Sequence, residues 1–185
     1  MRKKNVIADI HVGRRDLDLT QAAARNDVAA LRRLLDEGHR ADEGGDAWTA
    51  LIWAARSGSI DAMKVLLDSG ADVNRPGPTG DDWDATPLFL AAGDTDPTSI
   101  TLLLAHGADS SVADEHGATP LSRAVSAGTL NGPDRPMFGG CRVETVRALV
   151  SHNPALRPQR NAAWRDAIWW ARVQRCPDVL RLVGE

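Results

Sequence analysis

Residues 48–74 read WTALIWAARSGSIDAMKVLLDSGADVN and contain two short helical patterns in succession. The first pattern carries apolar residues at 51–55 and stops at Gly58, and the second places apolar residues at helical spacing over 60–67 and stops at Gly70. Helices this short are not stable alone in water, and two of them bury too little apolar surface to form a domain. The unit therefore needs similar neighbours.

Similar units follow along the chain. TPL occurs at Thr86 and again at Thr119, which is 33 positions later, and TAL occurs at Thr49. Leu-Leu followed by Gly-Ala-Asp occurs at 66–72 and at 103–109. This period with a TPL opening resembles the ankyrin repeat. The resemblance covers residues 17–185 and implies an all-α solenoid of stacked helix-turn-helix units, with short hairpin fingers and capping repeats.

The repeats predict one domain preceded by a short N-terminal segment. Residues 1–16 are basic and unpatterned, and we expect a tail or a cap. The domain spans 17–185, with units at about 17–45, 46–79, 80–113, 114–154 and 155–185. An insertion near 129–141 separates the two helices of the fourth unit. The first and last units depart from the pattern, as capping repeats do.

The register of the last unit is open. An offset of 116 sets Trp164 on Trp48 and Trp169 on Trp53, but it also sets Trp170 on Ala54. In ankyrin repeats that last position is a tight contact between helices, which does not normally accept Trp. Either the final helix pair is splayed or the register is wrong.

Patterns that are missing from the sequence argue against several classes of protein. No apolar run approaches the roughly 18 residues that span a membrane, and no apolar segment follows the basic N-terminus as in a secretory signal. Cys141 and Cys176 lie in unrelated contexts, so we expect reduced thiols and a cytoplasmic location. Arginine outnumbers lysine, which is consistent with a bacterial ankyrin-repeat protein.

The net charge of −3 hides an asymmetry. Sixteen acidic and four basic residues lie between Asp36 and Gly117, a charge of −12, which leaves nine acidic and eighteen basic residues elsewhere, a charge of +9. A field of this kind steers charged partners. We therefore expect a partner protein with a basic surface, and the same field disfavours nucleic acid.

The resemblance points to a binding surface. In ankyrin-repeat proteins the inner helices and finger tips line a concave groove, and exposed aromatic residues flanked by charge are typical of interface hot spots. The Pro/Gly-rich insertion, with Met137 and Phe138 at its tip, is a second candidate contact. The predicted partner-binding residues are Trp48, Trp53, Trp83, Asp46, Asp82, Asp84, Leu90, Arg123, Met137 and Phe138. The alternative is that Trp48 and Trp83 pack across the finger loops. Asp114, at the start of a finger, is expected to support the turn.

No pattern in the sequence indicates catalysis. The histidines lack the i, i+4 spacing of a zinc site, no Cys-x-x-Cys occurs, and the glycines of 76–82 lack a phosphate-loop context. We therefore expect no catalytic, metal or cofactor residues, no small-molecule ligand and no membrane partner. The predicted function is non-enzymatic protein–protein interaction. The alternative is an inhibitor or immunity protein that neutralises a bacterial toxin or enzyme with a basic cleft.

Overall fold

The computed structural model describes residues 14–43, 48–77, 85–93, 96–114, 116–126, 141–153, 156 and 161–185. Those residues form ten helices and no strand, which confirms the all-α class. The helices are α1 (Arg14–Ala24), α2 (Val28–Asp36), α3 (Ala50–Ser57), α4 (Ile60–Asp68), α5 (Pro87–Ala91), α6 (Pro97–Ala105), α7 (Pro120–Val125), α8 (Val143–His152), α9 (Ala162–Val173) and α10 (Pro177–Val183). The first helix begins inside the segment that we expected to be a tail or a cap.

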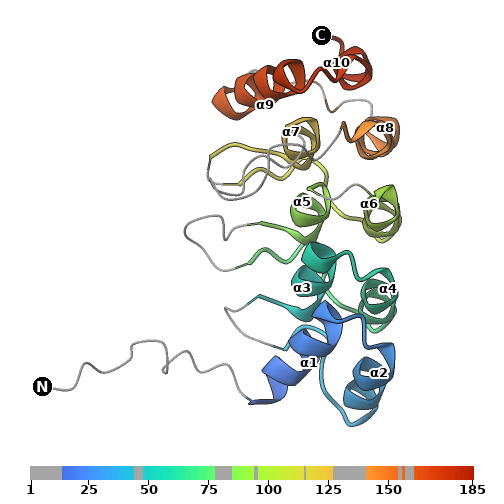
Figure 1. The fold of residues 1–185 in the computed structure, drawn as a ribbon. Helices are drawn as coiled ribbons and strands as arrows, with labels where there is room; N and C mark the ends of the chain where they lie inside the picture. Colours follow the sequence, from blue (N-terminus) through green and yellow to red (C-terminus); the bar gives the residue numbers. More distant parts are fainter. Residues whose placement is uncertain are drawn as a thin grey trace, which may run out of the picture.

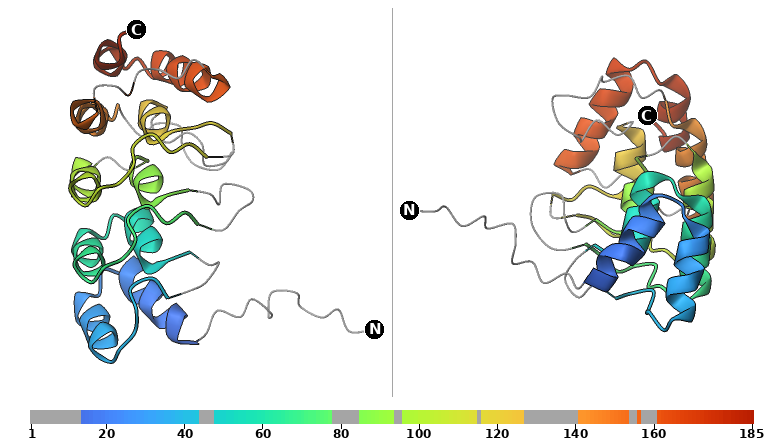
Figure 2. Two further views of the ribbon diagram at one scale, coloured as in Figure 1. Left: turned by 180° about the vertical axis from the view of Figure 1, so that it is seen from behind. Right: turned by 60° about the horizontal axis from the view of Figure 1, so that its bottom comes forward.

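The helices stack in two columns. The odd-numbered helices form one column and the even-numbered helices the other, and successive helix pairs lie one above another (Figure 1). Helix α3, for example, packs against α1 and α5 in its own column and against α4 beside it. Seen from behind, the described parts of the connections between pairs again run out on the side of the odd-numbered column (Figure 2). The stack is a helical solenoid.

The repeated threonines are the N-caps of α3, α5 and α7. The hydroxyl oxygens of Thr49, Thr86 and Thr119 each accept a hydrogen bond from the backbone N–H three residues later, at 3.2–3.3 Å. A proline follows Thr86 and Thr119, where its fixed φ suits the first helical turn. The TPL motif is therefore an N-cap with a preorganised first turn.

Small residues allow the two columns to approach closely. Ala54, Ala91, Ala124 and Ala171 are all fully buried, and leucines of the even-numbered helices, such as Leu66, Leu103 and Leu149, complete one continuous core. A repeat protein of this kind has no core inside a single unit, because each helix pair buries its apolar face only against its neighbours.

Side chains in the loops tie successive units together. The Asn74 amide donates to the carbonyl oxygen of Gly107 (3.1 Å) and accepts from the backbone N–H of Asp109 (2.7 Å). One unit earlier, the Asp42 carboxylate accepts from the backbone N–H of Asp72 at 2.9 Å. These bonds satisfy loop backbone groups that no regular structure would satisfy.

The structure settles the register of the last unit. Arg175 has a positive φ (55°) and occupies the position of Gly58 (φ 65°) at the joint between the two helices. The backbone N–H of Cys176 then donates to the carbonyl of Ala171, as Ser59 does to Ala54. The offset is therefore 117, and the register based on 116 was wrong by one residue. Ala171, and not Trp170, takes the tight position. The error arose because no glycine marks this joint and because α9 is longer than α3.

The expectation of reduced thiols was also wrong. Cys141 and Cys176 form a disulfide, with Cα atoms 5.5 Å apart. Cys141 lies just before α8 and Cys176 is the N-cap of α10, so the bond joins the starts of two neighbouring helices in the even-numbered column. Stacking of the last two units brings together cysteines that are 35 positions apart in the sequence. The argument for a cytoplasmic location from free thiols is therefore lost.

Candidate protein-binding surface

One residue in each odd-numbered helix occupies the same place, directly before the alanine of the tight contact. The row is Gln21, Trp53, Leu90, Arg123 and Trp170. Trp53, Leu90 and Arg123 are three of the predicted partner-binding residues, and they lie at equivalent positions of α3, α5 and α7. Their exposure differs, however, because their neighbours differ. Trp53 is 37% exposed, Leu90 is half-buried and Arg123 is only 8% exposed.

Trp53 is the exposed aromatic residue at the centre of this surface. Its ring lies 5.1 Å from the ring of Trp48, centroid to centroid, with the planes tilted by 53°. The guanidinium carbon of Arg56 lies 5.0 Å from the Trp48 centroid and 6.0 Å from the Trp53 centroid. Both distances are within cation–π range. We call Trp48, Trp53 and Arg56 the Trp53 cluster. Its mutual contacts hold an apolar ring at the surface in a fixed orientation.

Trp48 was predicted as a partner-binding residue, with packing against the finger loop as the alternative, and the structure buries its side chain. Only 9% of this residue is exposed, and it packs beneath Trp53 and Arg56 rather than standing out on a finger. It lies directly before the N-cap Thr49, where the chain turns back into α3. Trp48 therefore holds Trp53 and Arg56 from a buried position and presents little area of its own.

Arg123 is likewise not available to a partner. Its guanidinium carbon lies 4.8 Å from the centroid of the Phe89 ring, and a Cβ atom added to Gly93 would be 2.9 Å from its Nε. The side chain of Arg123 thus fills the space that Gly93 leaves open beside α5. Sequence position alone could not show this, because it depends on the absence of a side chain in the neighbouring unit.

Replacement of Arg123 by Ala is expected to lower the free energy of unfolding by roughly 1–2 kcal/mol, because the cation–π contact and the packing of the stem are both lost. Denaturant titration measures this, and Arg147→Ala, an exposed change on α8, is the matched control with an expected effect within about 0.5 kcal/mol. An Arg123→Ala protein as stable as the wild type would show that the contact with Phe89 contributes nothing.

The remaining predicted residues lie outside the part of the chain that the structure describes. They are Asp46, Trp83, Asp82, Asp84, Met137 and Phe138. For the finger at Asp114 the structure does bear on the prediction. Its carboxylate accepts from the backbone N–H groups of His116 (3.0 Å) and Ala118 (2.8 Å), so the expected turn-supporting role is confirmed.

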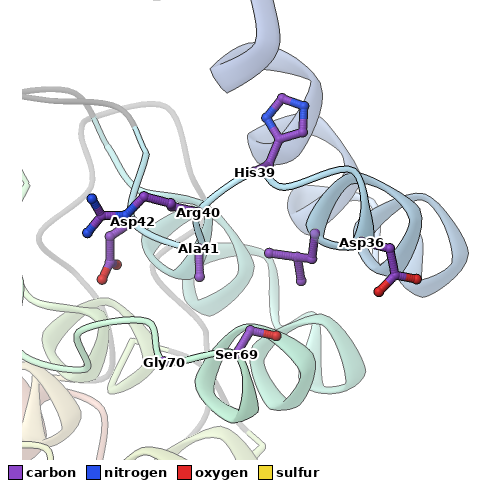
Figure 3. A pocket seen from close by; sticks show the side chains of 8 residues that line it. Asp36, His39, Arg40, Ala41, Asp42, Ser69 and Gly70 are labelled. Atoms are coloured by element: carbon purple, nitrogen blue, oxygen red, sulfur yellow. The ribbon is translucent and has the colours of Figure 1, made fainter.

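A polar hollow of about 490 Å³ lies beside the loops that follow α2 and α4. Its labelled residues come from the end of α2, the loop after it and the segment after α4, and their side chains do not converge on one point (Figure 3). His39 pairs with Glu43 at 3.1 Å, and a hydrogen bond from the backbone of Arg40 holds the pKa of the Glu43 carboxyl below its usual value. No group of three His, Cys, Asp or Glu residues able to hold a metal occurs among the residues described. The polar side chains of this hollow form hydrogen bonds within and between the loops, as His39 does with Glu43 and Asp42 with the backbone of Asp72.

Helix α9 carries a second exposed aromatic residue among those described. Trp169 is 57% exposed and borders a hollow of about 540 Å³ whose floor is formed by the buried residues Trp164 and Ile168. Arg172, at the rim, pairs with Glu185 at 3.4 Å. Trp164 is therefore part of the core of the last unit, whereas Trp169 lies on its surface.

Stacked helix pairs, three of which open with a threonine N-cap, define a helical repeat protein, and comparison with known proteins gives its family. Residues 8–77 match the family model described as ankyrin repeats (3 copies). Together with the helical stack, this makes the chain an ankyrin-repeat protein. Ankyrin repeats are in general modules of protein–protein interaction. None of the helices described is both long and apolar enough to cross a membrane.

Relatives come from varied organisms. The chain is 38% identical over 117 residues to Protein PhlB of Serratia liquefaciens, an alignment that covers 63% of this chain and 50% of that protein. It is 35% identical over 119 residues to a putative ankyrin repeat-containing protein of Treponema pallidum, which covers 63% of this chain and 37% of that one. It is 43% identical over 89 residues to the serine/threonine-protein kinase VIK of Arabidopsis thaliana, which covers 46% and 19%. The chain thus spans half or less of these relatives, and what it shares with them is the repeat region.

Proposed function

We propose that the chain binds a partner protein through the face of the odd-numbered helices around Trp53, and that it does so without catalysing a reaction. The observation that carries this proposal is the Trp53 cluster, in which an exposed indole is held by a buried indole and a guanidinium. Tryptophan and arginine are the residues most enriched at interface hot spots. In a soluble domain a large aromatic ring supported in this way is typical of a contact point.

Rigidity is the second argument. Binding costs free energy for every side chain that becomes ordered at the interface, about 0.5–1.5 kcal/mol for a side chain with many rotamers. The Trp53 ring already contacts Trp48 and Arg56 before any partner arrives. The helix that carries it is fixed on three sides by α1, α4 and α5. Few side chains of this surface therefore need to become ordered when the partner binds, so the entropy lost on binding is small.

Charge supports a basic partner surface. Residues 36–117 carry a charge of −12, and this segment contains the Trp53 cluster. Long-range attraction of this kind raises the association rate and is screened by salt. The same negative charge would repel a nucleic-acid backbone. A disulfide is typical of oxidising compartments, so we propose a location of that kind in place of the cytoplasm.

Replacement of Trp53 by Ala is expected to weaken partner binding by roughly 30-fold or more, which corresponds to a hot-spot loss of about 2 kcal/mol. The measurement is a pull-down from the native host, at low and high salt, followed by titration of the captured partner. Trp169→Ala removes a still more exposed indole from α9 and is the matched control, with an unchanged affinity expected.

Three outcomes separate the alternatives. Equal binding by wild type and a folded Trp53→Ala variant would contradict the proposal. Loss on Trp169→Ala instead would move the site to the hollow beside α9. An inhibitor and a scaffold protein would bind the partner through the same surface. Assay of the partner's activity in the complex distinguishes the two, because only an inhibitor lowers that activity.

A further inference from the structure

Among the exposed arginines of the described chain, Arg56 is distinguished by its contact with two indole rings. Within the residues described, four of the other exposed arginines are paired with a carboxylate, whereas Arg56 shares the lack of such a partner with Arg25, Arg32, Arg40, Arg165 and Arg175. Arg33, Arg147, Arg172 and Arg181 each lie within 4.0 Å of a carboxylate, at 3.9, 3.3, 3.4 and 3.2 Å respectively. No ion pair or side-chain hydrogen bond found among the described residues involves Arg56, although it lies in a segment rich in acids. Its contacts are the two indole rings of the Trp53 cluster.

The cation–π contacts leave the hydrogen-bonding capacity of the guanidinium unused. A ring that attracts a cation does so through its π face and accepts no conventional hydrogen bond. Guanidinium N–H groups form a rigid planar fork that matches the two oxygens of a carboxylate. Arg56 is exposed, so these donors can be reached from outside. The rings also restrict the guanidinium, which lowers the entropy lost on binding.

We propose that the Trp53 cluster binds an acidic side chain of the partner, with the carboxylate held by the fork of Arg56 and an adjacent apolar side chain packed on the ring of Trp53. This rests on the proposed function and deepens it, because it states the chemistry of the contact. Trp53 and Arg56 are three residues apart on α3, on neighbouring positions of one helix face. A short segment of the partner can therefore reach both.

The surrounding charge makes such a contact specific. Residues 36–117 repel acidic surfaces as a whole, so a partner that is acidic throughout is disfavoured at long range. A partner with one carboxylate in an otherwise basic surface is attracted by the negative charge of residues 36–117, and its carboxylate can still pair with the guanidinium of Arg56. Charged groups arranged in this way fix the register of an interface and reject wrong partners.

The test uses short random peptides displayed on phage and selected on the full chain. We expect the enriched peptides to carry Asp or Glu beside a large apolar residue. Synthetic versions are then titrated with the wild type and with Arg56→Gln, Arg56→Lys, Trp53→Ala and Lys64→Gln. Lys64 is exposed on α4 of the same helix pair, so Lys64→Gln removes the same charge away from the cluster.

Arg56→Gln is expected to weaken binding roughly 10- to 100-fold, the range for a charge-assisted bidentate contact. Arg56→Lys keeps the charge but loses the fork, so a smaller loss is expected. Glu→Gln in the peptide should cost as much as Arg56→Gln, and the two changes together should cost little more than either alone. Lys64→Gln should leave the affinity nearly unchanged.

The outcomes distinguish this inference from the proposed function. Binding that is lost with Trp53→Ala but retained with Arg56→Gln would overturn the carboxylate contact and leave the Trp53 surface in place. Enrichment of Lys- or Arg-rich peptides, or of none with an acidic residue, would overturn it as well. Peptides whose binding is insensitive to Trp53→Ala would count against both.

Discussion

Reduction of the Cys141–Cys176 disulfide is expected to lower the free energy of unfolding by about 3–4 kcal/mol, the chain-entropy value for a loop of this length. The loss should fall mainly on the last unit. The bond joins the start of α8 to the start of α10, and α10 packs only on α8 and α9 among the main contacts of the described helices. Because repeat units are stabilised by their neighbours, a terminal unit released at one side is the first to open.

Hydrogen exchange and thermal unfolding, each with and without reductant, measure this effect. We expect faster exchange in α9 and α10 on reduction, with α3 and α4 unchanged. A Cys141→Ser, Cys176→Ser double variant should resemble the reduced protein and should no longer respond to reductant. Rapid alkylation of both cysteines in protein purified without reductant would contradict the account, because it would show that the bond does not form.

Replacement of Leu103 by Ala is expected to cost about 2–5 kcal/mol, the range for large-to-small changes in a packed core. Leu103 lies in the middle helix of the even-numbered column and is fully buried. Helix α6 connects α4 below to α8 above, so a cavity here weakens the coupling between the two halves of the stack.

Denaturant titration tests this with a control on the same helix. Leu102 is only half-buried, so Leu102→Ala should cost well under half as much. A broadened or two-step transition in Leu103→Ala would be consistent with uncoupled halves. Equal costs for the two variants would contradict the placement of Leu103 in the core.

The helical stack was predictable because its signals are local. Threonine hydroxyls reach a backbone N–H only three residues away, and glycine tolerates the positive φ at Gly58, so both leave marks in the sequence. The last unit lacked these marks. Arg175 adopts the positive φ there, and the register was therefore misplaced by one residue. The disulfide was missed for another reason, since spacing along the chain does not reveal which cysteines stacking brings together.

The candidate site was predictable in position but not in exposure. The resemblance to ankyrin repeats pointed to Trp53, Leu90 and Arg123, and the three residues occupy equivalent positions of α3, α5 and α7. Whether each faces solvent depends on side chains of neighbouring units. Arg123 is buried beside Phe89 because Gly93 has no side chain there. Trp53 packs against Trp48 and stays partly exposed. Arg56 was not singled out from the sequence, because an arginine in the last turn of a helix is ordinary until its contacts are known.

The most direct test of the Trp53 surface is a photo-crosslinking residue placed at position 21, the exposed neighbour of Trp53 in the same row, compared with the same residue at position 64 on the even-numbered column. We expect crosslinks to the partner from position 21 and not from position 64, with the yield reduced by Trp53→Ala. Crosslinks from position 64 alone would place the interface on the opposite column and contradict the proposed function.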